Sequence, residues 1–200
     1  MTENLTQGSS EWKQAREGLL TASNFAAAIG LNPYMSRQKL YREIIGEEPP
    51  FEGNEMTAYG TEHEPDAVFA YEAHTGAFTE ETGFWVHPEH DWLGASPDRL
   101  VGDSGLIECK CKFSGELWET VPAHYMAQIQ GQLVIANRLF CDFVSWSPTG
   151  LAIFRVPLSG EYWNAMLPLL EKFWQSVINL EEPKRAKKPV MPEVKYERII

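Results

Sequence analysis

The stretch GASPDRLVGDSGLIECKCKF, residues 94–113, holds two β-rich runs joined by the turn-forming segment GDSG, and it predicts a β-hairpin. Side chains alternate between the two faces of a strand, so Glu108, Lys110 and Lys112 share one face of the second run. The first run brings Asp98 near Glu108. The opposite face of the second run is apolar, and we expect it to pack into the core: Ile107, Cys109, Cys111 and Phe113.

The charged side chains of this hairpin are of the types that hold a hard divalent cation. Mg²⁺ prefers oxygen ligands, usually one or two carboxylates together with water and substrate phosphate. Such a cation activates a bound water and neutralises charge on phosphorus, while a neighbouring lysine positions the water, loses a proton to it or stabilises the transition state. The pattern therefore favours phosphodiester hydrolysis, but the same residues also fit a surface salt bridge worth ~0–1 kcal/mol.

The rest of the chain predicts one α/β domain over residues 1–200, with a central mixed β-sheet flanked by helices. We see no internal repeat and no linker. The stretch 183–200 is a basic, proline-containing tail, which we interpret as a solvated end rather than a DNA-binding element. Helices are expected in two short pieces around Gly18 and over 36–45, 56–75, 122–137 and 159–182, and strands within 77–113, 139–148 and 150–158.

Composition excludes several classes of protein. Apolar residues make up 44% of the chain, which supports a core, but no apolar run reaches the ~18 residues of a membrane span, and the N-terminal residues lack a secretory pattern. Three cysteines argue against a disulfide framework, and the Cys109–Cys111 spacing is poor for zinc, so we expect buried thiols in a reducing cytosol.

The net charge of −11 argues against a nucleic-acid-binding protein, because phosphate neutralisation needs lysine and arginine. Binding is local, however, and the basic residues gather at Lys13 to Arg42 and in the segment PKRAKK. The bulk charge therefore leaves a basic binding surface possible.

Four blocks of sequence resemble bacteriophage lambda exonuclease and the related phage alkaline exonucleases, a family of the PD-(D/E)xK nuclease superfamily. They occur in the family's order between about residues 11 and 148: EWKQAREGLLTAS, AYGTEHEPDAVFAYEAHTG, GASPDRLVGDSGLIECKCKF and HYMAQIQGQLVIA followed by FVSWSP. The resemblance implies a restriction-endonuclease-like core. It also implies a metal-dependent 5′-to-3′ exonuclease that acts on double-stranded DNA ends, releases mononucleotides and leaves a 3′ overhang for recombination by strand annealing.

The resemblance also implies the residues of the active site. The metal ligands would be Glu64, Asp98, Glu108 and the backbone carbonyl of Cys109, and the metals would be two Mg²⁺ ions, with Mn²⁺ as a substitute. Lys110 would be the catalytic lysine. Tyr125 and Gln128 would line the site, with Gln128 near the nucleophilic water or the scissile phosphate, and Gln132, one turn further on, is placed to share their helix face.

A guanidinium and hydroxyls at a helix start, here Arg16, Thr21 and Ser23, form an anion pocket. The resemblance implies that the 5′-terminal phosphate binds there, with Ser96 as a further donor. The alternative is that Thr21 and Ser23 only cap a helix and Arg16 is solvated. An apolar wedge that opens the duplex would fall at Met56, with Thr57 as a weaker candidate.

The family further implies a homotrimeric ring, a single-strand-annealing recombinase as partner, no membrane, and a place of action in the cytoplasm of a bacterial host that carries the phage or prophage. Rival interpretations are a restriction-like or repair endonuclease of the same superfamily and a non-catalytic DNA-end binding protein. A soluble interaction protein is a third, which would leave the four blocks unexplained. The presence of all four residues of the catalytic pattern, Glu64, Asp98, Glu108 and Lys110, argues against the non-catalytic interpretation.

Overall fold

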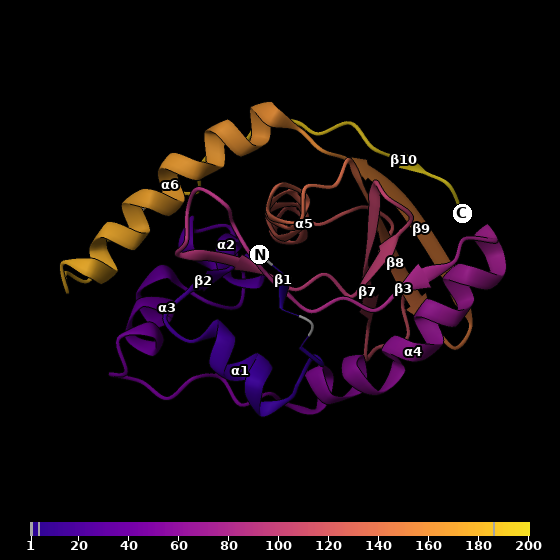
Figure 1. Cartoon of the computed structure of the whole chain (residues 1–200), viewed down its shortest axis with the longest axis horizontal. Coiled ribbons are helices and arrows are strands. Elements are labelled where there is room, and N and C mark those ends of the chain that lie inside the picture. Colours follow the sequence, from indigo (N-terminus) through magenta and orange to yellow (C-terminus); the bar gives the residue numbers. More distant parts are fainter. Residues whose placement is uncertain (1, 4, 186) are drawn as a thin grey trace.

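The computed structural model describes residues 2–3, 5–185 and 187–200 (Figure 1). The helices of this part of the chain are α1 (Ser10–Arg16), α2 (Ala22–Ala28), α3 (Arg37–Ile44), α4 (Glu55–Thr75), α5 (Ala123–Ile135) and α6 (Gly160–Ile178). Its strands are β1 (Thr2–Glu3), β2 (Leu20–Thr21), β3 (Thr79–Glu80), β4 (Phe84–Val86), β5 (Leu93–Ala95), β6 (Arg99–Val101), β7 (Gly105–Cys111), β8 (Phe140–Ser147), β9 (Gly150–Pro157) and β10 (Glu197–Arg198).

The central sheet is mixed, as predicted. Within the described residues it has six strands in the order β10-β9-β8-β7-β6-β3, and β7 and β8 pair in parallel while the other neighbours are antiparallel. Helices α4 and α5 lie on opposite sides of this sheet (Figure 1). The parallel β7–β8 pair is connected through α5, so the sheet's central strand is covered on both faces.

Strand β7 shows the alternation that the sequence predicts. Ile107 and Cys109 pack against Ala67 and Tyr71 of α4, whereas Glu108 lies on the opposite face, beneath α5. The β6–β7 hairpin pairs Arg99 with Ile107, so the segment just before β6 runs beside the centre of β7. The prediction for Phe113 is wrong: β7 ends before it, and its side chain is 55% exposed because only the ring of Tyr59 packs edge-on against it.

The structure also contains a second, smaller sheet, whereas the sequence predicted a single sheet. Over the described residues it has four strands in the order β1-β4-β5-β2, each only two or three residues long. Leu20 pairs in parallel with Leu93, and the chain then leaves β5 directly into Ser96 and Asp98. This sheet therefore fixes the start of α2 beside the β6–β7 hairpin.

Helix α5 approaches α2 closely because Gly131 has no side chain. A Cβ at this position would lie 2.4 Å from the ring of Phe25, a distance that real Cβ atoms essentially never show. Phe25 is fully buried and belongs to the main core cluster with Leu20 and Leu133. The contact fixes the position of α5 relative to the sheet. It therefore also fixes where the glutamine side chains on the sheet-facing side of α5 lie.

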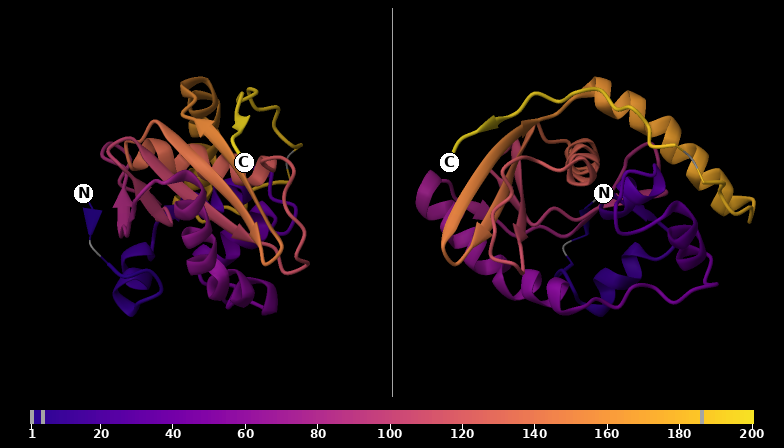
Figure 2. Two further views of the ribbon diagram at one scale, coloured as in Figure 1. Left: turned by 90° about the vertical axis from the view of Figure 1, so that its right-hand side faces the viewer. Right: turned by 180° about the vertical axis from the view of Figure 1, so that it is seen from behind.

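The interpretation of the C-terminal residues as a solvated end is wrong for their last part. Figure 2 shows this segment (yellow) crossing from α6 to the edge of the central sheet, where β10 pairs with β9. Val194 is buried, and the hydroxyl of Tyr196 accepts a hydrogen bond from the backbone N–H of Val121. The edge of β9 supplies backbone hydrogen-bond partners for this segment. The proline-rich composition of the segment does not reveal them. The basic side chains of the described residues 184–185 and 187–188 are exposed.

The three cysteines are free thiols, and Cys109 and Cys141 are buried, as expected. None of the helices formed by the described residues combines the length and the apolar character that a membrane crossing requires.

Candidate active site

A cavity of about 190 Å³ opens between α1, the start of α2, the segment before β6, strand β7 and α5. It brings together residues that the sequence placed in two separate groups. The predicted site residues that line it are Arg16, Thr21, Ser23, Ser96, Asp98, Glu108, Lys110 and Gln128. Of the remaining predicted residues, Glu64 and Tyr125 flank this cavity, whereas Met56 and Thr57 lie outside it.

Glu108 is the centre of the cavity's hydrogen bonding, although it is only 2% exposed. Its Oε1 accepts hydrogen bonds from Nζ of Lys110 and, at 2.6 Å, from Nε2 of Gln128. Its Oε2 accepts a hydrogen bond from Nε2 of Gln132, also at 2.6 Å. The carboxylate is therefore held on both oxygens, as a buried charge requires.

Two further carboxylates face Glu108. Oδ2 of Asp98 accepts a hydrogen bond from the backbone N–H of Cys109 at 2.6 Å, which ties the segment before β6 to the middle of β7. Burial raises the pKa of Asp98 well above its ordinary value, and repulsion from Glu108 and Glu64 raises it further. Burial also raises the pKa of Glu64; Arg99 opposes this change, and repulsion from Glu108 adds to it.

Lys110 provides a positive charge inside this group of acids. Burial lowers its pKa, but attraction to Glu108 and Asp98 outweighs burial, and the pKa is raised above that of a free lysine. The side chain is therefore an ammonium ion at neutral pH. Its Nζ lies 5.0 Å from the centre of the Tyr125 ring, so the predicted Tyr125 borders the site through a cation–π contact.

The donor set fits a hard divalent cation by its chemistry. Glu64, Asp98 and Glu108 supply carboxylate oxygens. Burial, and to a smaller extent repulsion among these acids, raises the pKa of Glu64 and of Asp98, so a nearby cation would stabilise their charged forms. No group of three or more His, Cys, Asp or Glu side chains among the described residues is arranged as a preformed metal cage. The metal ligands, with the Cys109 carbonyl, thus stay a prediction that rests on charge and donor type.

The other end of the cavity is basic and polar. Nη2 of Arg16 donates to the hydroxyls of Thr21 at 3.3 Å and Ser23 at 3.4 Å. Burial lowers the pKa of Arg16 to about 10, which still leaves it charged at neutral pH. No carboxylate within the described ranges forms an ion pair with Arg16. A partly buried guanidinium that faces hydroxyls instead of an acid is suited to bind an anion.

The alternative, that Thr21 and Ser23 only cap a helix, holds for the position of Thr21 but not for its side chain. Thr21 is the residue before α2, but its side chain makes no capping hydrogen bond. Its hydroxyl, which is nearly buried, instead contacts Arg16 and the hydroxyl of Ser23 at 3.1 Å. The two hydroxyls therefore face Arg16, as the predicted anion pocket requires.

Trp12 and Gln7 line the cavity and were not predicted. The indole Nε1 of Trp12 donates to Oγ of Ser96 at 2.9 Å, and the guanidinium of Arg16 lies 4.1 Å from the centre of a Trp12 ring. Gln7 donates to the carbonyl of Pro97 at 2.7 Å. The signal for Trp12 was its position four residues before Arg16, which places both on one face of α1.

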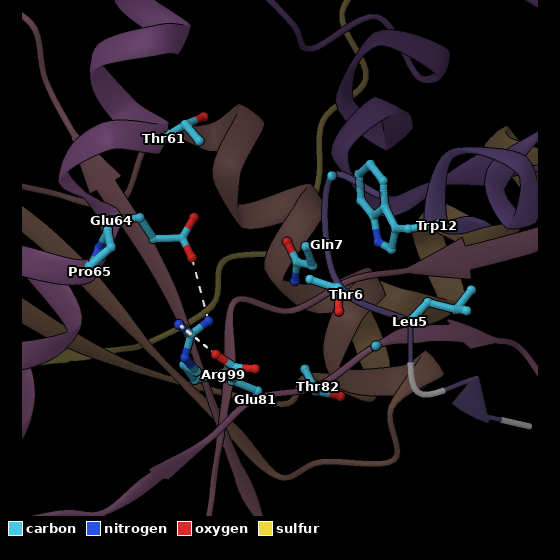
Figure 3. Close-up of a pocket in the computed structure, with 12 residues that line it drawn as sticks. Leu5, Thr6, Gln7, Trp12, Thr61, Glu64, Pro65, Glu81, Thr82 and Arg99 are labelled. Carbon is cyan, nitrogen blue, oxygen red and sulfur yellow. Dashed lines mark ion pairs between the residues drawn. The ribbon is translucent and has the colours of Figure 1, made fainter. Parts of the chain in front are cut away.

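A larger adjoining cavity of about 640 Å³ shares Trp12 and Gln7 with the first one. Figure 3 shows Arg99 between two carboxylates in this cavity, 3.6 Å from Glu64 and 3.8 Å from Glu81. Arg99 directly follows Asp98 in the chain and was not predicted as a site residue. It orients Glu64 along the rim between the two cavities.

The candidate wedge residues lie in the first turn of α4. The hydroxyl of Thr57 is engaged in a capping box with Asn54, while the side chain of Met56 is 60% exposed. Met56 is therefore the freer of the two to contact a nucleic acid.

The fold and the site together define a nuclease: one hairpin presents Asp98, Glu108 and Lys110, and a helix brings Glu64 to face them. The chain belongs to the YqaJ-like viral recombinase domain family, which matches residues 11–139. Among solved structures, the alkaline exonuclease LHK-Exo from Laribacter hongkongensis has a TM-score of 0.74 and 30% identity, over 86% of this chain and 94% of that chain. This match confirms the predicted relationship to the alkaline exonucleases.

LHK-Exo has also been solved in complex with dAMP. Two further relatives have lower sequence identity. A phage-related exonuclease from Haemophilus somnus has a TM-score of 0.61 at 16% identity, over 81% of this chain and 96% of that chain, and shares the fold. The uncharacterized protein R354 of Acanthamoeba polyphaga mimivirus is 27% identical over 158 residues, which is 69% of this chain. The aligned part spans only 28% of that mimivirus protein.

Proposed function

We propose that this protein is a metal-dependent 5′-to-3′ exonuclease that acts on double-stranded DNA ends, releases mononucleotides and leaves a 3′ single-stranded overhang. The observation that carries the proposal is that one cavity holds both the unpaired guanidinium of Arg16 and the group formed by Asp98, Glu108 and Lys110. A strand end whose terminal phosphate binds at Arg16 would present its first phosphodiester to the carboxylates.

In this proposal the chain's residues divide the work between binding and chemistry. Arg16, Thr21 and Ser23 bind the terminal phosphate, and Ser96 is a further donor, held in place by the indole of Trp12. The ammonium of Lys110 donates to the scissile phosphate and stabilises the charge that develops on it. Gln128 holds Glu108 and lies where it can orient the attacking water.

Glu64, Asp98, Glu108 and the Cys109 carbonyl would hold two Mg²⁺ ions, or Mn²⁺ in their place. Bound cations would supply a water of lowered pKa and neutralise charge on the phosphate. The closeness of these carboxylates, which repel one another, and the oxygen-only donor set support this choice of metal.

The recombination role is supported by the family, whose description is that of a viral recombinase domain. The 3′ overhang would serve a single-strand-annealing recombinase, in the cytoplasm of a bacterial host that carries the phage or prophage. A homotrimeric ring would direct the basic residues between Lys13 and Arg42 inward and the acidic surface outward, which reconciles the net charge of −11 with DNA binding. Sedimentation of a monomer at micromolar concentration would contradict the ring.

The proposal is tested with linear duplex that carries or lacks a 5′ phosphate, and with closed circular duplex, in Mg²⁺ or EDTA. Degradation of phosphorylated linear duplex in Mg²⁺ only, with mononucleotide products and intact circles, is expected. Cleavage of closed circles would instead support the restriction-like or repair endonuclease.

A pair of lysine variants separates catalysis from binding. Lys110→Met is expected to abolish cleavage while duplex ends still bind, as measured by fluorescence anisotropy. Lys112→Met is the matched control: Lys112 directly follows β7, two residues after Lys110, but it pairs with Glu116 at 3.0 Å and not with Glu108. Wild-type digestion by Lys110→Met would refute the assignment. Binding without cleavage by the wild-type protein in Mg²⁺ would favour a non-catalytic end-binding protein.

A further inference from the structure

Two buried glutamines of α5 differ in how their amides are used. Gln130 is 0% exposed, and both ends of its amide bind backbone: Nε2 donates to the carbonyl of Pro157 at 2.9 Å, and Oε1 accepts from the N–H of Ser159 at 2.8 Å. Gln132 is 1% exposed, and only its Nε2 is bonded, to Glu108 at 2.6 Å and to the carbonyl of Ser96 at 3.4 Å. Its Oε1 is buried and receives no hydrogen bond from any described residue.

The orientation of the Gln132 amide follows from its neighbours. An ionised carboxylate and a backbone carbonyl can only accept hydrogen bonds, so the NH₂ group must face Glu108 and Ser96. The carbonyl oxygen is consequently the atom left without a donor. A buried acceptor without a partner is unfavourable, and native proteins retain few of them.

The location of Gln132 indicates which donor its oxygen would meet. Gln132 lines the cavity that also contains Asp98, Glu108 and Lys110. Lys110 already donates to Oε1 of Glu108, on the other side of that carboxylate from Gln132. Water is the donor that a polar cavity of about 190 Å³ admits beside a carboxylate.

We propose that Gln132 is a positioning residue of the nuclease site: its N–H fixes Oε2 of Glu108, and its carbonyl oxygen accepts a hydrogen bond from a water molecule held beside Glu108. The inference rests on the proposed function. With Lys110 and Gln128 on one oxygen of Glu108 and Gln132 on the other, the carboxylate cannot rotate. Gln132 thus acts through Glu108 and through the water, not by contact with the DNA.

The test compares Gln132→Met with Gln130→Met, which remove amides of the same size from the same buried helix. Partners that orient a metal ligand typically contribute 10- to 100-fold to metal affinity or activity. Gln132→Met is expected to weaken Mn²⁺ binding to the DNA-free protein by roughly 10-fold or more, measured by titration calorimetry. It is also expected to lower kcat by a similar factor, with KM for duplex ends unchanged. Gln130→Met is expected to lower the unfolding temperature but to leave Mn²⁺ affinity and kcat within about twofold of wild type, because the amide of Gln130 hydrogen-bonds to backbone groups and Met126 and not to Glu108.

A second variant, Gln132→Asn, guards against a folding defect. It keeps an amide at this position but shortens the side chain by one carbon, so the bond to Glu108 is lost and the same direction of change is expected. Wild-type Mn²⁺ affinity and kcat in either folded Gln132 variant, or an equal loss in Gln130→Met, would overturn the inference alone. A wild-type protein that neither binds Mn²⁺ nor cleaves DNA would overturn the proposed function and the inference together.

Discussion

Replacing Arg16 by methionine is expected to remove the preference for 5′-phosphorylated ends. The guanidinium already faces Thr21 and Ser23 and has no carboxylate partner among the described residues, so its charge is available to a phosphate. Two unit charges 4 Å apart interact by about 4 kcal/mol at an effective dielectric constant of 20. Because Arg16 is only partly buried, solvent screens its interaction with a phosphate. The expected interaction energy is therefore near the ~1.5–3 kcal/mol of a hydrogen bond to a charged group.

That energy corresponds to a loss of roughly 10- to 150-fold in kcat/KM on phosphorylated ends. The assay is steady-state digestion of two linear duplexes that differ only in the 5′ phosphate. Hydroxyl ends are expected to be digested at similar rates by wild type and Arg16→Met. Lys13→Met is the control, because Lys13 is exposed on the same helix and lies outside the cavity.

Stability must be measured beside activity. Arg16→Met breaks no ion pair of the described residues and keeps an apolar side chain against Trp12, so the change in unfolding free energy is expected to stay within about 1 kcal/mol, or roughly 2–4 °C. A folded Arg16→Met protein that still prefers phosphorylated ends as strongly as wild type would refute the assignment of the phosphate pocket. Equal losses in Lys13→Met would show that general charge, not the pocket, sets the preference.

Three further predictions concern the fold. Asp142→Asn is expected to destabilise the protein by about 3 kcal/mol in urea unfolding, because Asp142 is fully buried and binds Arg155 through two hydrogen bonds of 2.8 Å. Gly131→Ala is expected to lower unfolding free energy by about 1–3 kcal/mol, since the added methyl group meets the ring of Phe25; an unchanged midpoint would show that α5 can shift. Tyr196→Phe is expected to lower the free energy of unfolding by about 1 kcal/mol, because it removes the hydroxyl that accepts a hydrogen bond from the backbone N–H of Val121 before α5. An unchanged thermal unfolding temperature would mean that this contact of the C-terminal segment adds little stability.

The elements that the sequence predicted well carry a readable period or a distinct end signal. Strand β7 alternates acid and base on one face with apolar residues on the other, and both faces are buried in the way this alternation requires. Helix α6 begins after the N-cap Ser159, and α4 ends before the left-handed Gly76, which agrees with the predicted start at 159 and the predicted end at 75. Strands of two or three residues carry no such period, and the small sheet depends on the pairing of Leu20 with Leu93, which lie far apart in the sequence.

The C-terminal segment, residues 183–200, shows a different limit of prediction from sequence. Prolines and basic residues dominate its composition, and composition alone favoured a solvated end. The packed residues Val194 and Tyr196 alternate with exposed Lys195 and Glu197, which is a strand pattern, but it is too short to outweigh the composition. The deciding fact was an open edge at β9, and only the assembled sheet reveals it.

At the site, the charged residues and the glutamines Gln128 and Gln132 were expected from the sequence, whereas Trp12, Gln7 and Arg99 were not. Asp98, Glu108 and Lys110 share a short motif whose chemistry is recognisable in the sequence. An aromatic residue such as Trp12 on a short helix ordinarily indicates packing. Its role becomes visible only when the fold brings it against Ser96, 84 residues away, and places the guanidinium of Arg16 over its ring.

The proposed selection of DNA ends is compatible with the net charge of −11, because binding depends on local charge. A terminal phosphate ester carries up to about two negative charges near pH 7, whereas an internal phosphodiester carries one, so an unpaired guanidinium favours the end of a strand. This preference depends on local charge and does not require a basic surface over the rest of the molecule. The acids that dominate the net charge belong partly to the site itself, where Glu64, Asp98 and Glu108 would be neutralised by the cations of the proposed reaction.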